Sequence, residues 1–169
     1  MERRHGINAT RTLYLANPYG FSASQKAGPL RELCLHLEAL GAKVWEPFES
    51  PEVRDRSLPN WAWRVARSNA RAVRNADGVF AVVNGCPPDE GVMVEVGLAV
   101  AWQKPLFLFR DDFRRCSDSE DYPLNLMLFS GYTAEGWRDY WYDSIDGIAN
   151  PEGALVRWLK GEDVQPLEA

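Results

Sequence analysis

Acidic side chains in the middle of the sequence have the type and the spacing that covalent catalysis requires. Asp89 and Glu90 stand in a short predicted loop, and Glu95 follows as the only charged residue before Lys104. Asp89 and Glu95 are six residues apart, one in the loop and one just over a turn into the next helix, so both can point into one crevice. An ionised carboxylate in a partly dry crevice acts as a nucleophile or stabilises a cationic transition state.

The same acids also fit a structural role. Asp89 and Glu90 would then cap the helix, whose N-terminus favours anionic side chains by about 0.3–1 kcal/mol at exposed sites, and Glu95 would be a solvated surface acid. However, Glu95 lies between Val94 and Val96, and a solitary acid among apolar neighbours is unfavourable to bury without a purpose. Glu95 is therefore the leading candidate for catalysis or ligand binding, and both interpretations stay open.

Hydrophobic periodicity predicts the elements that must position these acids. Short apolar runs predict five strands, at 12–16, 43–46, 78–84, 104–110 and 137–142. The segments between and after them predict helices at 25–40, 61–74, 91–102 and 151–159. Strands that alternate with helices imply parallel pairing with right-handed crossovers. We therefore expect a single α/β domain with a five-stranded, mostly parallel sheet flanked by helices, of the flavodoxin-like or Rossmann-like kind.

The architecture itself predicts where a ligand binds. In open parallel sheets, ligands lie beyond the carboxyl ends of the strands. This rule selects the loops at 16–24, 46–58, 84–91 and 110–125. The loop 84–91 carries Asp89, so the acids lie at the expected edge.

The length of 169 residues fits one domain. We expect one folded domain at 12–162 with tails at 1–11 and 163–169. A net charge of −5 gives no general attraction to phosphate backbones, so nucleic acid is not an expected partner. Apolar runs are shorter than the roughly 18 residues of a membrane span, and the polar start resembles no secretory signal. The expected location is the cytoplasm, with no membrane partner.

The sequence lacks the common cofactor and metal motifs. It has no GxGxxG after the first predicted strand and no GxxxxGK[ST]. Its cysteines, Cys34, Cys86 and Cys116, are widely spaced and form no CxxC pair, so they predict neither a disulfide framework nor a zinc site. We expect no metal and no organic cofactor.

Several other residues have two readings each. The aromatic residues Phe21, Trp61 and Trp63 would stack on a planar ligand or serve as hydrophobic staples or subunit contacts. Asp77, at the start of a predicted strand, would contact substrate or hold the architecture. The run 110–115 is typical of a solvated, self-paired loop, and its place after the fourth strand also suits a lid or a sugar contact.

Four motifs together resemble one enzyme family. They are Tyr14-Leu15-Ala16-Asn17-Pro18, Ala76-Asp77-Gly78, the run from Asp89 to Ala99, and Asn125-Leu126-Met127. In this order and at these separations they resemble the nucleoside 2-deoxyribosyltransferases, from about Leu13 to the last predicted helix.

The resemblance implies a role for each matching residue. Glu95 would attack C1′ of a 2′-deoxynucleoside, expel the base and form a covalent deoxyribosyl-enzyme, which a second free nucleobase resolves. Tyr14 would hold the Glu95 carboxylate, and Asp89 would accept a hydrogen bond from the sugar 5′-hydroxyl. Asn125 and Met127 would come from a neighbouring subunit and complete the sugar pocket, which implies a homo-oligomer.

One position departs from the family pattern. The family commonly has an aspartate facing the base where this sequence has Asn69, and an amide hydrogen-bonds a base without delivering a proton. Asn69, Phe21 and Asp77 complete the expected substrate contacts, although Asn69 could instead face solvent. Asp89 favours free nucleosides over nucleotides, because a 5′-phosphate would face like charge.

Two alternative functions remain at this stage. A 2′-deoxynucleoside N-hydrolase would use the same Glu95 and pass the sugar to water. A non-catalytic module would use a similar fold to sense nucleosides or nucleotides.

Overall fold

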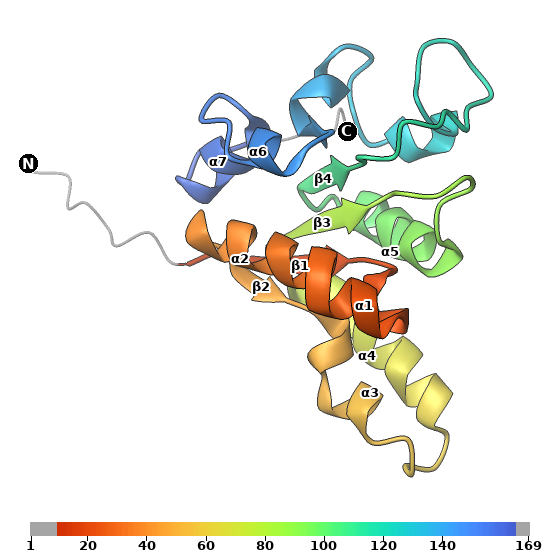
Figure 1. Cartoon of the computed structure of the whole chain (residues 1–169). Helices are drawn as coiled ribbons and strands as arrows, with labels where there is room; N and C mark the ends of the chain where they lie inside the picture. The colour runs from red at the N-terminus through yellow and green to blue at the C-terminus, as the bar shows by residue number, and fades with distance from the viewer. Residues whose placement is uncertain (1–9, 165–169) are drawn as a thin grey trace, which may run out of the picture.

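Five parallel strands form one sheet in the order β2-β1-β3-β4-β5 in the computed structural model, which describes residues 10–164 (Figure 1). All neighbouring strands are parallel. The strands are β1 (Thr12–Ala16), β2 (Lys43–Trp45), β3 (Gly78–Val82), β4 (Leu106–Phe109) and β5 (Trp141–Tyr142). This is the flavodoxin-like strand order. It confirms the predicted single α/β domain, with a sheet that is wholly parallel.

Helices connect and cover these strands (Figure 1). They are α1 (Ala23–Gln25), α2 (Arg31–Ala39), α3 (Pro51–Arg54), α4 (Trp61–Asn75), α5 (Glu90–Ala101), α6 (Ile145–Ile148) and α7 (Ala154–Leu159). The shorter 3-10 helices are η1 (Tyr19–Phe21), η3 (Pro47–Glu49), η4 (Leu126–Phe129) and η5 (Gly136–Tyr140).

The helix predicted at 25–40 is a run of three segments. A π-helical segment, η2 (Lys26–Leu30), joins α1 to α2 and contains Pro29. Proline has no N–H and its ring clashes with the carbonyl four residues earlier, so the regular α-helical ladder cannot pass through it. The local irregularity is therefore a consequence of Pro29.

Alternation along β1 sends its side chains to opposite layers. Leu13 and Leu15 pack with α2 and α7 on one face of the sheet. Tyr14 and Ala16 pack with α4 and α5 on the other. Tyr14 is therefore carried into the layer that contains Glu95.

The largest deviations from the predicted elements lie near the C-terminus. The predicted strand 137–142 is mostly η5, and only Trp141–Tyr142 pair with β4. The helix predicted at 151–159 begins at Ala154, and α6 was not predicted. The expected tails, 1–11 and 163–169, fall largely outside the described residues.

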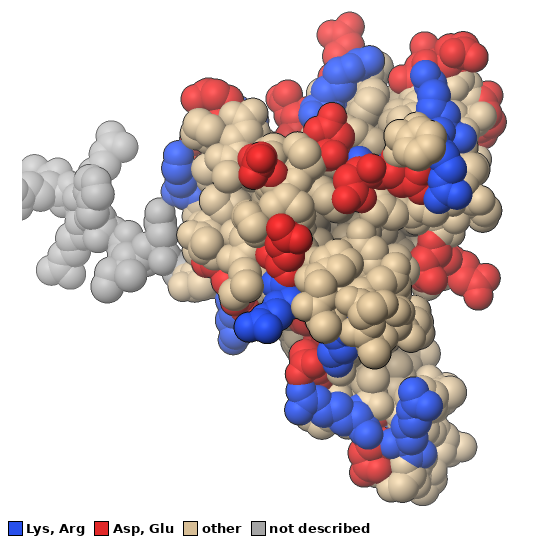
Figure 2. All heavy atoms as spheres, viewed as in Figure 1, with Lys and Arg blue, Asp and Glu red and all other residues tan. Residues whose placement is uncertain are grey.

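Charge is unevenly distributed over the surface. Lys and Arg side chains gather around α3 and α4, at the lower end of the view in Figure 2. Within residues 10–164, no helix combines the length and the apolar character needed to cross a bilayer.

Candidate active site

Glu95 and Tyr14 form a hydrogen-bonded pair between α5 and β1. On α5, Glu95 borders the stripe of Val92, Val96 and Ala99 that packs into the core. Tyr14 is fully buried, and its hydroxyl donates a hydrogen bond to Glu95 Oε1 at 2.5 Å. The two residues are 81 positions apart in sequence, so only the packing of α5 on the sheet brings them together.

Burial dominates the electrostatics of this pair. Removal from water raises the pKa of Glu95 to about 7, the hydrogen bond from Tyr14 opposes this rise, and the charge of Asp89 adds to it. Burial, together with the adjacent Glu95, raises the pKa of Tyr14 far above its ordinary value. Tyr14 therefore stays protonated as a donor, and Glu95 is a carboxylate that ionises near neutral pH. Such a group suits nucleophilic attack on an electrophilic carbon.

Asp89 is the N-cap of α5. Its Oδ1 accepts a hydrogen bond from the Val92 backbone N–H at 3.0 Å, which confirms the capping role. Its effect on the pKa of Glu95 shows that the two carboxylates lie within electrostatic range. Contact of Asp89 with a sugar hydroxyl stays a prediction.

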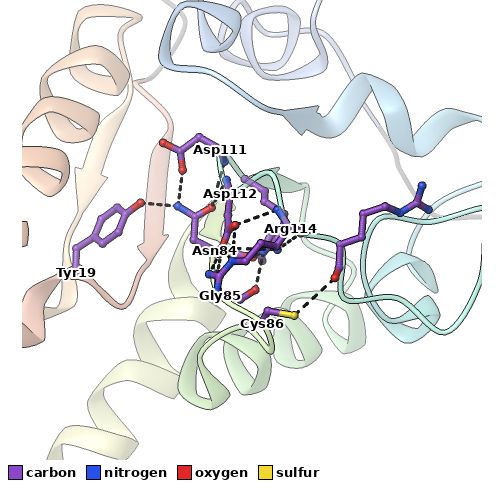
Figure 3. Close-up of polar contacts among 10 residues, drawn as sticks. Tyr19, Asn84, Gly85, Cys86, Asp111, Asp112 and Arg114 are labelled. Atoms are coloured by element: carbon purple, nitrogen blue, oxygen red, sulfur yellow. Dashed lines mark hydrogen bonds and ion pairs between the residues drawn. The ribbon is translucent and has the colours of Figure 1, made fainter.

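The loop that carries Asp89 is tied to the segment after β4 by Asn84 (Figure 3). The Asn84 amide nitrogen donates to the Tyr19 hydroxyl at 2.8 Å and to Asp111 Oδ1 at 2.5 Å. Its carbonyl oxygen accepts from the backbone N–H groups of Asp111 and Asp112 at 3.1 and 3.3 Å. Asn84 thus joins the ends of β3 and β4 to the turn after β1.

Arg110 stabilises the same loop through hydrogen bonds to its backbone. It is 4% exposed and donates to the backbone carbonyls of Val83, Gly85 and Arg114. The expectation of a solvated run is therefore wrong for Arg110, because three buried or half-buried carbonyls need its donors. The self-pairing is confirmed further along, where Arg114 binds Asp112 and holds the pKa of that carboxyl below its ordinary value.

Gly85 is required by the geometry of this loop. Its φ of +105° lies in a region that side chains rarely adopt, and a Cβ would stand 2.8 Å from the Pro87 carbonyl oxygen. Its N–H donates to Asp112 Oδ2 at 3.2 Å. The chain can therefore turn from β3 toward Asp89 only with glycine here.

Glu46 is an acid at the carboxyl edge that sequence reasoning missed. Its Oε1 accepts from Phe48 N–H at 3.1 Å and from the Asn17 amide at 3.3 Å, whereas its buried Oε2 has no partner. Burial raises the pKa of Glu46, and its charge contributes to the raised pKa of Tyr14. The available signal was its position as the last residue of the predicted strand 43–46, directly before Pro47.

Asn69 and Phe21 meet in one cavity. Side chains from α4, η1 and the segment 47–56 line a space of about 410 Å³, here called the α4 cavity, which includes Phe21, Trp61 and Asn69. Its lining does not include Glu95. However, Asn69 lies one turn before Val73, which packs in the same core cluster as Tyr14. The cavity is therefore bounded by α4, the helix that packs on the same face of the sheet as Tyr14.

Asp77 does not join the site. It lies before β3, at the amino edge of the sheet, where its Oδ2 accepts the Thr12 N–H at 2.7 Å. This corrects the expectation of a substrate contact: the start and the end of a strand are opposite edges of the sheet.

Asn125 and Met127 lie on the other side of α5. Both line a cavity of about 930 Å³ with Met93, Gly97 and Val100, which on a helix face away from Glu95. Asn125 accepts the Met127 N–H at 3.0 Å and donates to Asp118, and Met127 is 66% exposed. Within one chain they therefore do not meet Glu95, and their contribution to a neighbouring site stays a prediction.

Residues 10–164 bring no group of three or more His, Cys, Asp or Glu side chains close enough to hold a metal ion. The site offers a half-buried, tyrosine-bound carboxylate at the ligand-binding edge of a parallel sheet.

Comparison with known proteins identifies the family of the chain. A family model described as nucleoside 2-deoxyribosyltransferase matches residues 13–127. No curated protein shows significant sequence similarity to the chain.

Solved structures are similar over most of the chain. A 2-deoxyribosyltransferase from the psychrotolerant bacterium Bacillus psychrosaccharolyticus has 22% identity and a TM-score of 0.61, over 93% of this chain and 99% of that one. A 2-deoxyribosyltransferase from Leishmania mexicana has 22% identity and a TM-score of 0.61, over 85% and 98%. A conserved protein from Enterococcus faecalis V583 has 25% identity and a TM-score of 0.56, over 63% and 67%. At 22% identity the similarity establishes the fold.

Proposed function

The chain belongs to the nucleoside 2-deoxyribosyltransferase family, and we propose that it transfers 2-deoxyribose between nucleobases through a covalent intermediate on Glu95. The observation that carries the proposal is the Tyr14–Glu95 hydrogen bond of 2.5 Å, which holds a half-buried carboxylate at the ligand-binding edge. Tyr14 keeps one oxygen of Glu95 fixed and leaves the other for reaction.

The reaction proceeds in two displacements. A Glu95 carboxylate oxygen forms a bond to C1′ of a 2′-deoxynucleoside while the C1′–N bond breaks and its electron pair leaves with the base. The transition state resembles an oxocarbenium ion, which a nearby anion stabilises. A ring nitrogen of a second base then attacks C1′, the carboxylate leaves, and the new nucleoside loses a proton from that nitrogen. Two inversions restore the original configuration.

Other residues support binding. Asp89 accepts the sugar 5′-hydroxyl with the oxygen that does not cap α5. Asn125 and Met127 of a neighbouring subunit complete the sugar pocket in a homo-oligomer. The exposed apolar side chains Val94 and Leu126, 64% and 46% exposed, support such an assembly.

A transfer assay with a matched pair of variants tests the proposal. Deoxyinosine is incubated with uracil or adenine, and the products are separated by chromatography. New deoxyuridine or deoxyadenosine is the expected result, and Glu95→Gln should lower its rate by about 10³-fold or more. Glu90→Gln, which changes an exposed acid on the same helix, should leave the rate unchanged.

Other product patterns would contradict the proposal. Free deoxyribose formed at the same rate with and without acceptor indicates hydrolysis. Unchanged substrate that nevertheless binds indicates sensing. Full activity in Glu95→Gln would remove Glu95 from the mechanism.

A further inference from the structure

The charged side chains that line the α4 cavity are all cationic. Lys26, Arg54 and Arg56 contribute three cationic side chains, and none of the described residues that line the cavity is a carboxylate. Guanidinium and ammonium groups are hydrogen-bond donors only. The charged side chains of the cavity therefore present only donors to whatever occupies it.

The positive charge is only partly compensated. Glu49, outside the lining, forms ion pairs with Lys26 at 2.9 Å and with Arg54, so one carboxylate is shared between two cations. The Arg56 guanidinium lies over the Trp61 ring, 5.3 Å from its centroid. Basic side chains also gather around α3 and α4 in Figure 2, the elements that contribute Arg54 and Asn69 to the lining. An occupant that carries or develops negative charge is favoured here.

Two further donors are unused. Trp61 Nε1 is buried and has no hydrogen-bond partner, which is unfavourable for an indole N–H unless a ligand acceptor reaches it. The Asn69 amide forms no hydrogen bond within the part of the chain that the structure describes. Both groups lie in the lining, so an acceptor atom of a ligand would satisfy them.

Aromatic rings make the cavity suitable for a flat ligand. Phe21 and Phe48 meet edge to face with centroids 4.9 Å apart. The Phe48 ring packs directly against the backbone of Gly20, where a Cβ would come within 2.1 Å of it. Planar rings pack well on such surfaces, and a cavity of about 410 Å³ lies in the range of small-molecule sites.

We infer that the α4 cavity holds the nucleobase and selects bases with ring carbonyl groups, such as uracil, thymine and hypoxanthine, over the amino-bases cytosine and adenine. This inference rests on the proposed function. When the C1′–N bond breaks, its electron pair passes to the base and spreads to the carbonyl oxygen. Asn69 supplies no proton, so the cations and the Trp61 N–H stabilise the departing anion, which takes its proton from water afterwards. An amino group at the same ring position is itself a hydrogen-bond donor, so it cannot accept a hydrogen bond from the cations or from the Trp61 N–H.

Two substrate pairs that differ at one ring position test the selection. The pairs are deoxyuridine with deoxycytidine, and deoxyinosine with deoxyadenosine. In each pair kcat/KM should favour the oxo-base by about 10-fold or more. Trp61→Phe, which keeps a ring and removes the N–H, and Arg56→Gln should each lower this ratio several-fold. Arg67→Gln, an exposed α4 position outside the lining, should leave it unchanged.

Binding of the free bases separates the inference from the proposed function. Calorimetry should show tighter binding of uracil than of cytosine, and of hypoxanthine than of adenine, whether or not transfer occurs. The inference is overturned if the enzyme is active but its kcat/KM for the oxo-base substrate is equal to or below that for the amino-base substrate. It is also overturned if the free oxo-base and amino-base bind with equal affinity. In both cases the transfer proposal still stands. The inference is also overturned if the enzyme prefers deoxyuridine 5′-monophosphate to deoxyuridine and Arg56→Gln abolishes this preference, because the cations would then hold a phosphate. Selective base binding without turnover overturns the transfer proposal and supports the selection.

Discussion

Each edge of the sheet carries a carboxylate that the sequence analysis treated as a candidate site residue, but the hydrogen-bond partners of the two carboxylates differ. At the amino edge, Asp77 accepts a backbone N–H from Thr12 at 2.7 Å. At the carboxyl edge, the partner of Glu95 is the Tyr14 hydroxyl, at 2.5 Å. The first contact joins two strands, whereas the second holds a half-buried acid without neutralising it.

Neighbouring polar groups repeat the contrast. Near Asp77, Lys104 Nζ donates to the Ala76 carbonyl at 2.7 Å, so a second charged side chain is bound to backbone. At the carboxyl edge, Glu46, whose charge acts on Tyr14, keeps a buried oxygen without any partner. The partner of an acid, rather than its residue type, therefore distinguishes a structural carboxylate from one that is available to a ligand.

Among the variants that test this comparison, Tyr14→Phe has the largest expected effect. Loss of the hydroxyl frees the Glu95 carboxylate and removes the contact that lowers its pKa. We expect kcat/KM for transfer to fall about 10- to 100-fold. The wild-type rate should rise with pH through about 7 because only ionised Glu95 attacks, and in the variant this rise should move to higher pH. A lower rate with an unshifted pH profile would mean that Tyr14 serves packing only.

A smaller effect is expected on stability in Glu95→Gln. Folding raises the pKa of Glu95 from 4.5 to about 7, so the folded state binds the proton more tightly than the unfolded state. The stability that Glu95 contributes is complete below pH 4.5 and is lost as the pH rises through 7. Above pH 7 the glutamine variant should exceed the wild type by about 2 kcal/mol in the free energy of unfolding.

Urea unfolding at pH 4.5 and pH 8 measures this difference. Glu90→Gln, at an exposed position of the same helix, should show the wild-type dependence on pH. A glutamine variant that is less stable than the wild type at pH 8 would contradict an uncompensated carboxylate at position 95.

The smallest effect is expected from Asp77→Ala. It removes the acceptor for the Thr12 N–H, and the free energy of unfolding should fall by about 1 kcal/mol. Transfer activity below the melting temperature should stay within about two-fold of the wild type, because surface changes away from a site have small effects. A large loss of kcat in a folded Asp77→Ala protein would contradict the conclusion that the carboxylate at the amino edge is structural.

Local patterns predicted most of the fold. The apolar runs at β1, β3 and β4 and the helical spacing at α2, α4 and α5 were identified within a few residues of their observed bounds. The C-terminal part was predicted less well, because β5 pairs through two residues only and the aromatic segment before it packs as η5 without an alternating pattern.

The sequence by itself determined the fold class and singled out Glu95, because hydrophobic periodicity and an isolated charge are properties of neighbouring residues. Its resemblance to a family supplied the expected roles of Tyr14 and Asp89. Only the tertiary structure decided that burial raises the pKa of Glu95 to about 7, that Asp77 faces the opposite edge, and that Glu46 and Trp61 keep unsatisfied buried atoms. The physical reason is that burial, pairing and charge balance depend on segments far apart in the chain, which meet only when α4 and α5 pack on the sheet.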